Sequence, residues 1–489
     1  MSALNPAKEL KVLLRVVLTL VGCPFCFAID LVSTNSAGFQ GPVTEEPRAS
    51  AISNDGNTVL FVADDPTLIP GVAFNLYLKT MSTGAILPIL KRFDGLPLQT
   101  GIPNYSHMNE PPTHVVFSSS EPNLVAGTAD PFNTRRRIYT SVIGSYQYSP
   151  ARGLVNDLEV LPWDFTANSR LDRIYMQTGV SGGGPETFQI VEVSAAAPTP
   201  LIVHTVRPDG LPSQVPTSAP DPSIFPSISA SADGKILSWW GMQFDLDPVG
   251  NAGLVTGQVF IRDTQLGVTR QVRADDGQNM HFAIMPRVSD DGSYVVFNAD
   301  SYFVGAGGCN DYSIYGVDTR TWQRECISVN DSGQSANANS WRLDVSGDGS
   351  RVVFENRGRN LGPVDPSPLA QYGVYVRDRR LKRTVRVDVN ALGIPGNVRP
   401  FSILFPPPAT RSRYPRISKN GRWVVFTSDA SNLVPNDTNG HQNDVFRVDL
   451  NQFFPEGAAT LAPVPALSIW SSLLMVFGLL GMGWLFRRN

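Results

Sequence analysis

The 489-residue chain contains few cysteines and histidines, residue types that are common in metal and catalytic sites. It has only four cysteines and five histidines, and it contains no zinc-ligand spacing, no phosphate-cradling glycine loop and no dinucleotide fingerprint. Charged residues make up 17%, against roughly 25% in an average soluble domain. Long charged helices and coiled coils are therefore disfavoured. The 40 lysines and arginines are scattered and the net charge is −3, which argues against nucleic acid as a partner.

Glycine and proline are abundant instead, with 42 and 39 copies. Hydrophobic residues reach 42%, enough to bury a core, so wholesale disorder is excluded. The length allows about three average domains or one large repeat array.

The N-terminus has the layout of a secretory signal. Lys8, Lys11 and Arg15 precede an uncharged stretch over residues 16–28, which is too short to span a membrane. We expect residues 1–28 to be a signal peptide and the mature chain to begin near Ile29. Two alternatives are a buried N-terminal helix and a lipoprotein signal in which Cys23 is acylated.

The C-terminus predicts a membrane anchor. Residues 457–486 contain no charge, and Arg487 and Arg488 follow at once. We expect a Pro/Ala-rich stem over residues 451–466 and a transmembrane helix over residues 467–489, with the two arginines as a cytoplasmic stop. The intervening body, residues 29–450, then lies outside the cytoplasm.

The C-terminal segment, from Val464 to the terminal arginines, resembles the IPTL-CTERM sorting signal of Gram-negative bacteria. The residues that carry the resemblance are Val464, Pro465, Leu467, Ser468, Trp470, Arg487 and Arg488. The resemblance implies recognition and cleavage by a membrane enzyme of the exosortase type, and hence a location in the cell envelope or on the cell surface. Val464 replaces the family's first Ile, Ala466 replaces its Thr, and Ser471 stands where Gly commonly follows the Trp.

The body is built from one repeated frame, Ser-x-Asp/Asn-Gly-x-x-aliphatic-x-aromatic. It occurs as SNDGNTVLF, SADGKILSW, SDDGSYVVF, SGDGSRVVF and SKNGRWVVF, starting at Ser53, Ser231, Ser289, Ser346 and Ser418. Asp-Gly and Asn-Gly favour tight turns, and the β-branched and aromatic run after them suits a buried strand. A second phrase about 20 residues later, such as QVFIRDT or GVYVRDR, predicts a third strand, and a short fourth strand follows it.

Spacing fixes the number of repeats. Phe61 and Trp239 lie 178 residues apart, about three times the 58 and 57 residues that separate Trp239 from Phe297 and Phe297 from Phe354, so two degenerate copies fill the gap. The next interval, to Phe426, is lengthened to 72 residues by an insertion. We place the aromatic positions of the two degenerate copies at Phe117 and Tyr175. Seven four-stranded units predict an all-β, seven-bladed β-propeller, although six or eight blades remain open.

Closure of the ring is also predicted. The last unit lacks its fourth strand, while the segment that begins at Ile29 reads like the fourth-strand phrases. We expect the mature N-terminus to complete the seventh blade, which removes an exposed sheet edge. The phrases PRVSDDGSYVVF and PRISKNGRWVVF resemble the repeat of TolB-like propellers. That resemblance implies the fold and leaves function open.

Candidate sites are few. Asp437, Asn439 and Asp444 form an oxygen-rich loop that Ca²⁺ can bind, although turn formation explains the same residues and the EF-hand spacing is absent. No other cofactor is expected. Cys309 and Cys326, the only cysteines of the mature body, flank one predicted third strand and form a plausible disulfide in an oxidising compartment.

Three further features carry weaker functional interpretations. Residues 179–183 match the Gly-x-Ser-x-Gly nucleophile motif, but no helix follows the motif as the chemistry requires. The tryptophans Trp163, Trp239, Trp240 and Trp341 suit either a sugar-binding face or the core between blades. The irregular insertion at residues 391–413 is the expected contact region.

The sequence thus predicts an exported, envelope-anchored propeller that acts as a binding or scaffolding module for a protein or glycan ligand. The alternative is an extracytoplasmic hydrolase or lyase with its site in the propeller channel.

Overall fold

A computed structural model describes most of the propeller body. The described residues are 27–42, 47–95, 98, 106–121, 124–125, 137–150, 164–180, 187–194, 202–213, 227–241, 245–247, 257–273, 283–299, 309, 312–362, 372–397 and 412–455.

These residues form seven antiparallel four-stranded sheets, the blades of a β-propeller. Blade 1 holds β2 (Arg48–Ile52), β3 (Thr58–Ile69), β4 (Val72–Thr80) and β5 (Ile86–Pro88); blade 2 holds β6 (Ser106–Met108), β7 (His114–Ser119), β8 (Arg137–Val142) and β9 (Tyr148–Pro150); blade 3 holds β10 (Asp164–Ala167), β11 (Arg173–Val180), β12 (Thr187–Ser194) and β13 (Ile202–Val203). Blade 4 holds β14 (Ile228–Ala230), β15 (Ile236–Gly241), β16 (Gln258–Asp263) and β17 (Val268–Gln271); blade 5 holds β18 (Ala283–Val288), β19 (Tyr294–Ala299), β20 (Ser313–Asp318) and β21 (Arg324–Cys326). Blade 6 holds β22 (Ser340–Val345), β23 (Arg351–Asn356), β24 (Gly373–Asp378) and β25 (Arg383–Arg386); blade 7 holds β26 (Arg413–Ile417), β27 (Trp423–Ser428), β28 (Asp444–Asp449) and β1 (Ile29–Leu31).

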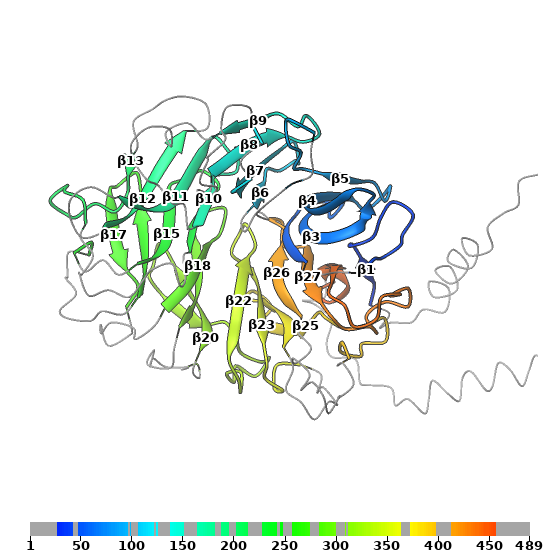
Figure 1. The fold of residues 1–489 in the computed structure, drawn as a ribbon. Coiled ribbons are helices and arrows are strands. Elements are labelled where there is room, and N and C mark those ends of the chain that lie inside the picture. Colours follow the sequence, from blue (N-terminus) through cyan, green and yellow to red (C-terminus); the bar gives the residue numbers. More distant parts are fainter. Residues whose placement is uncertain are drawn as a thin grey trace, which may run out of the picture. The chain divides into compact units, whose positions relative to one another are not determined.

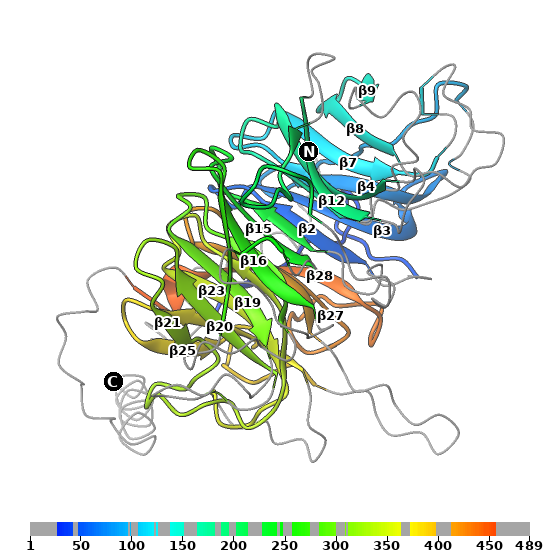
Figure 2. The same ribbon diagram turned by 90° about the vertical axis from the view of Figure 1, so that its left-hand side faces the viewer.

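The first strand of each sheet faces a common centre (Figure 1). Neighbouring inner strands contact one another from β10 through β14, β18, β22, β26 and β2 to β6. The gap between β6 and β10 is bridged by His107, whose Nε2 lies 3.3 Å from the carbonyl oxygen of Phe165. Figure 2 shows the blades side-on. The seven-bladed, four-stranded architecture predicted from the repeat spacing is confirmed.

The repeated frame forms the turn between the first and second strands of a blade. In all five clear copies the Ser hydroxyl accepts a hydrogen bond from the N–H five residues later, at 2.9–3.0 Å. The same hydroxyl donates to the Asp or Asn two residues later at 2.5–2.8 Å. The glycine adopts a left-handed conformation, with φ of 70° at Gly56 and 67° at Gly349. The turn therefore needs Ser, Asp/Asn and Gly at these three positions.

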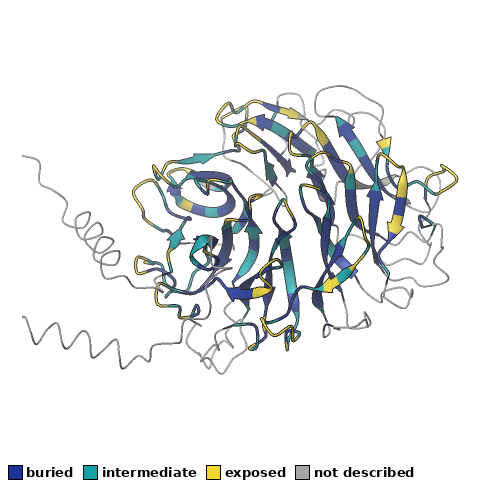
Figure 3. Ribbon diagram, turned by 180° about the vertical axis from the view of Figure 1, so that it is seen from behind, coloured by how far each residue is buried: buried dark blue, intermediate teal, exposed yellow. Residues whose placement is uncertain are grey.

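The aromatic residue of the frame lies in the core between neighbouring sheets. In six blades it pairs in register with an aromatic residue of the third strand, as Phe61 does with Tyr77 and Phe354 with Tyr375. The rings of the latter pair stack with their centroids 6.1 Å apart. Figure 3 shows that the strands are mostly buried and that exposure is concentrated at the turns.

Blade 3 corrects one predicted position. Asn168 begins its turn, and Leu171, with φ of 56°, occupies the place of the glycine. Met176, rather than Tyr175, is therefore eight residues after the start of the turn, and it pairs with Val191. The prediction at Tyr175 was wrong by one residue, which in a strand places the side chain on the opposite face of the sheet.

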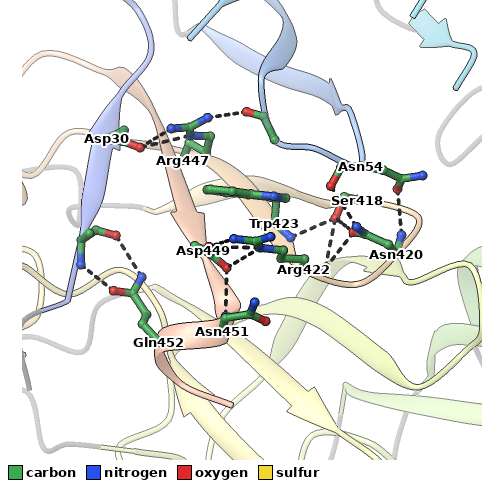
Figure 4. A network of polar contacts seen from close by, with 12 residues as sticks. Asp30, Asn54, Ser418, Asn420, Arg422, Trp423, Arg447, Asp449, Asn451 and Gln452 are labelled. Atoms are coloured by element: carbon green, nitrogen blue, oxygen red, sulfur yellow. Dashed lines mark hydrogen bonds and ion pairs between the residues drawn. The ribbon is translucent and has the colours of Figure 1, made fainter. Parts of the chain in front are cut away.

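The chain ends pair to close the ring, as the sequence predicts. β1 lies antiparallel to β28, with Asp30 opposite Arg447, and the Arg447 Nε donates to Asp30 Oδ2 at 3.1 Å (Figure 4). The Arg447 guanidinium lies 4.5 Å from the ring centroid of Trp423. Just beyond β28, the Gln452 Nε2 donates to the Ala28 carbonyl at 2.9 Å. The seventh blade is thus held by both chain ends.

The predicted terminal segments are largely outside the described residues. Residues 1–26 of the signal peptide, residues 456–466 of the stem and the whole helix at 467–489 belong to this undescribed part. Within the described ranges, no helix has the length and apolar character needed to cross a membrane.

Candidate binding site in the channel

The inner strands of all seven blades line a cavity of about 370 Å³ at the propeller centre. Aligning the blades by the first residue of each turn shows that the lining is layered, and that at one level every blade contributes a residue. The middle level consists of the residue two places before the turn in each blade. Its members are Ala51, His107, Thr166, Ser229, Arg287, Asp344 and Arg416.

Members of this middle layer also connect neighbouring blades. Ser229 Oγ accepts the backbone N–H of Val288 at 3.0 Å, and Asp344 Oδ2 accepts that of Ile417 at 3.1 Å. A short polar side chain therefore uses its hydrogen-bonding capacity on the next blade, whereas a long cationic side chain at the same level reaches into the channel.

A second level is built by β-bulges in the inner strands. The register shifts between Ile284 and Arg287, and equivalent shifts occur in β22, β26 and β2. Bulge residues Met285, Arg342 and Tyr414 have φ of 55°, 36° and 53°, an unusual conformation for residues other than glycine. Bulges redirect side chains, and these three residues line the cavity.

Arginine and tyrosine meet at this bulge level. The guanidinium of Arg342 lies 4.3 Å from the ring centroid of Tyr414, and that of Arg48 lies 5.3 Å from it. Glu355 fixes the arrangement, because it accepts the Tyr414 N–H at 2.8 Å and pairs with Arg342 at 3.2 Å. The cation–π contacts hold both guanidinium groups in place, and Glu355 balances the charge of Arg342.

The third level is an open series of hydrogen bonds that links the turns of successive blades from blade 3 round to blade 2. Ala232 accepts from Ser169 N–H at 3.0 Å and donates its own N–H to the Asp290 carbonyl at 2.8 Å. The series continues with the Gly347 N–H, which donates to the Lys419 carbonyl, and with the Asn420 N–H, which donates to Asn54 Oδ1. It ends with the Asn54 N–H, which donates to Glu110 at 2.9 Å. These bonds connect the turns of neighbouring blades at one end of the channel.

The channel carries excess positive charge. Its lining includes the cations Arg48, Arg287, Arg342, Arg416 and Lys419, against the carboxylates of Glu110, Asp290 and Asp344. Desolvation lowers the pKa of His107 to about 3, with the hydrogen bond to Phe165 opposing the shift and the charges of Lys419, Arg416 and Arg287 adding to it. Desolvation also disfavours the charged form of Lys419. The negative charges of Asp290, at 2.6 Å, and of Asp344 outweigh this desolvation and raise the pKa of Lys419. Neutral His107 thus sits among fixed cations.

The oxygen-rich loop of blade 7 forms a second cluster, away from this lining. Asp444 Oδ1 accepts from Ser33 Oγ at 2.7 Å, and its Oδ2 accepts from Gln40 Nε2 at 2.8 Å. Burial raises the pKa of Asp444 to about 6, against the opposing hydrogen bonds. Asp437 Oδ2 and Asn439 Oδ1 are buried without a hydrogen-bond partner among the described residues.

The chemistry of this loop suits a hard cation, yet it is sparse. Across the described ranges, no three His, Cys, Asp or Glu side chains are grouped so as to hold a metal ion. The loop provides two carboxylates and an amide oxygen, so Ca²⁺ binding there stays a prediction.

Cys309 and Cys326 form a disulfide in the structure. Cys309 precedes β20 and Cys326 lies in β21, and their Cα atoms are 5.8 Å apart. Cys326 itself pairs in register with Tyr315, so the bridge reaches past the end of the ladder and fastens the segment before β20.

The weaker candidates divide between core and undescribed segments. Trp239 and Trp240 are buried, which favours the core interpretation for both. Trp341 stacks on Tyr312 with centroids 5.5 Å apart. Trp163, Ser181 of the Gly-x-Ser-x-Gly match and residues 398–411 of the insertion lie outside the described residues.

Sequence reasoning missed the channel residues, although a signal existed. Counting back two positions from the turn Ser or Asn in every repeat would have collected His107, Arg287, Asp344 and Arg416 into one ring. Their side chains are chemically unlike, so no residue pattern marks them without the structural alignment of the repeats.

No protein-family model matches the chain, and no curated relative matches its sequence. Solved propeller structures do resemble it. They include a prolyl endopeptidase (TM-score 0.47, 11% identity, 79% of this chain and 47% of that chain covered) and the β-propeller domain of the Trilobed protease from Pyrococcus furiosus (0.43, 7%, 83% and 96%). TolB from Acinetobacter baumannii is a third (0.36, 13%, 85% and 88%). The chain spans about half the length of the prolyl endopeptidase, and identities this low say nothing about activity.

Proposed function

We propose that this protein is an exported, membrane-anchored β-propeller that binds a partner through its central channel. The observation that carries the proposal is the layered lining, in which every blade contributes one residue to the middle level of a single cavity that also holds five cationic side chains. Bulges are frequent at sheet edges and beside functional sites, and those next to Arg342 and Tyr414 place both residues in the lining of this cavity.

Three features support export and anchoring. The N-terminal basic-then-apolar segment is typical of a secretory signal, and the charge-free C-terminal stretch before Arg487 is typical of a membrane anchor. The Cys309–Cys326 disulfide fits an oxidising compartment. The sorting-signal resemblance adds an exosortase-type enzyme as a transient partner at the C-terminus.

Site-directed photo-crosslinking in the native envelope tests the binding role. A crosslinking amino acid replaces Met285 in the channel, and the matched control replaces Leu266, which is 75% exposed on the hairpin between β16 and β17. We expect a discrete adduct from position 285 and none from position 266. Adducts of equal yield at both positions, or none at position 285, would contradict channel binding.

Mass spectrometry of the mature protein tests processing. A chain that begins near Ile29 supports signal cleavage, and loss of the Arg487–Arg488 tail supports sorting. An uncut N-terminus in a chain recovered from the cytoplasm would contradict export.

A further inference from the structure

Two arginines of the channel have no carboxylate partner among the described residues. Arg287 Nη1 donates to Ser227 Oγ at 3.1 Å and to the Pro286 carbonyl at 3.0 Å, both of them neutral acceptors. The contact described for the Arg48 guanidinium is the one with the ring of Tyr414. Both side chains are half-buried, so each cation has given up part of its hydration.

The acids around these arginines are already engaged. Asp290 pairs with Lys419 at 2.6 Å, and Glu355 pairs with Arg342 at 3.2 Å. Asp344 accepts the Ile417 N–H at 3.1 Å, and Glu110 accepts the Asn54 N–H at 2.9 Å. Asp344 and Glu110 keep their negative charge, but with Glu355 included the five cations still outnumber the four carboxylates, and none of the four is paired with Arg48 or Arg287.

We infer that the channel takes a small ligand bearing two or more oxyanion groups, carboxylates or phosphates, which Arg287 and Arg48 bind. Guanidinium groups match such oxyanions through paired, charge-assisted hydrogen bonds, and these bonds are strongest where water is partly excluded. A cavity of about 370 Å³ lies within the range of small-molecule sites. The inference rests on the proposed function, because it names the ligand class of the same channel.

Calorimetric titration of the purified full chain tests the inference with two probes, citrate for carboxylates and tripolyphosphate for phosphates. The variants are Arg287→Gln and Arg48→Gln. The matched control is Arg320→Gln, since Arg320 is exposed on the turn after β20 in the same blade as Arg287. Thermal unfolding of each variant checks that it folds.

We expect at least one probe to bind at low salt, with affinity falling roughly tenfold or more in each channel variant and remaining unchanged in the control. A preference for citrate indicates a carboxylate ligand, and a preference for tripolyphosphate indicates a phosphate ligand. If neither probe binds, or if binding survives in both channel variants, the inference is overturned. A channel-specific crosslink at position 285 together with that result would leave the binding role intact and reject its anionic ligand alone.

Discussion

Replacing Asp444 by Asn should remove a specific part of the pH dependence of stability. Asp444 is 1% exposed and sits where β1 and β28 close the ring, accepting hydrogen bonds from Ser33 and Gln40. Burial disfavours its ionised form and raises its pKa from 3.8 to about 6, the hydrogen bonds oppose this, and the charge of Asp437 adds to it.

The sign of the effect follows from proton binding. Between about pH 4 and pH 6 the folded protein holds a proton on Asp444 that the unfolded chain has released, so ionisation opposes folding as the pH rises. A pKa raised from 3.8 to about 6 corresponds to a loss on the order of 3 kcal/mol in the free energy of unfolding, complete above about pH 7. Asn cannot ionise, so the variant avoids this loss.

Denaturant unfolding, followed by tryptophan fluorescence from pH 4 to pH 7.5, measures this loss in the free energy of unfolding. The free energy of unfolding of the wild type minus that of Asp444→Asn should become more negative as the pH rises through this window. Asp209→Asn serves as the control, because Asp209 is an exposed acid far along the chain from the closure. Parallel wild-type and Asp444→Asn curves across the window would refute the reasoning.

Three further outcomes are expected. Val32→Pro removes the Val32 N–H bond to the Val445 carbonyl, so it should cost about 2 kcal/mol and speed amide exchange in β28, whereas unchanged exchange there would show that β1 does not hold the blade. Cys326→Ser opens a bridge that spans 17 residues and should lower stability by about 3 kcal/mol, a difference that a reductant must abolish; a wild type insensitive to reductant would contradict it. Millimolar Ca²⁺ at pH 7.5 should raise the melting temperature by a few degrees in the wild type and not in Asp437→Asn, because the buried Oδ2 of Asp437 has no hydrogen-bond partner among the described residues. No shift in the wild type would rule the site out.

The fold could be predicted because the repeat encodes its own turn. Ser346, Asp348 and Gly349 each have a required part in the turn geometry, so the same letters recur wherever that geometry recurs. Where the turn is built differently, as at Asn168 in blade 3, the frame loses its letters and the position of the core residue slips by one.

The channel could not be predicted in the same way. Its middle level holds Ala51, which packs against a core cluster, in one blade and Asp344, which bonds the next blade, in another, so the repeat imposes no common residue type there. The bulges add a second obstacle, since positive φ at Arg342 and Tyr414 depends on the surrounding blades and leaves no local sequence signal. Strand periodicity alone therefore identifies the blades and omits the site.

The pairing of β1 with β28 also sets an order of events during biosynthesis. Asp30 is among the first residues of the body to leave the ribosome, and its partner Arg447 is among the last. The first six blades each consist of consecutive strands, whereas the seventh needs β1 from the start of the body and β26 to β28 from its end. A product terminated before Asp444 would consequently keep β1 without the strand that it pairs with.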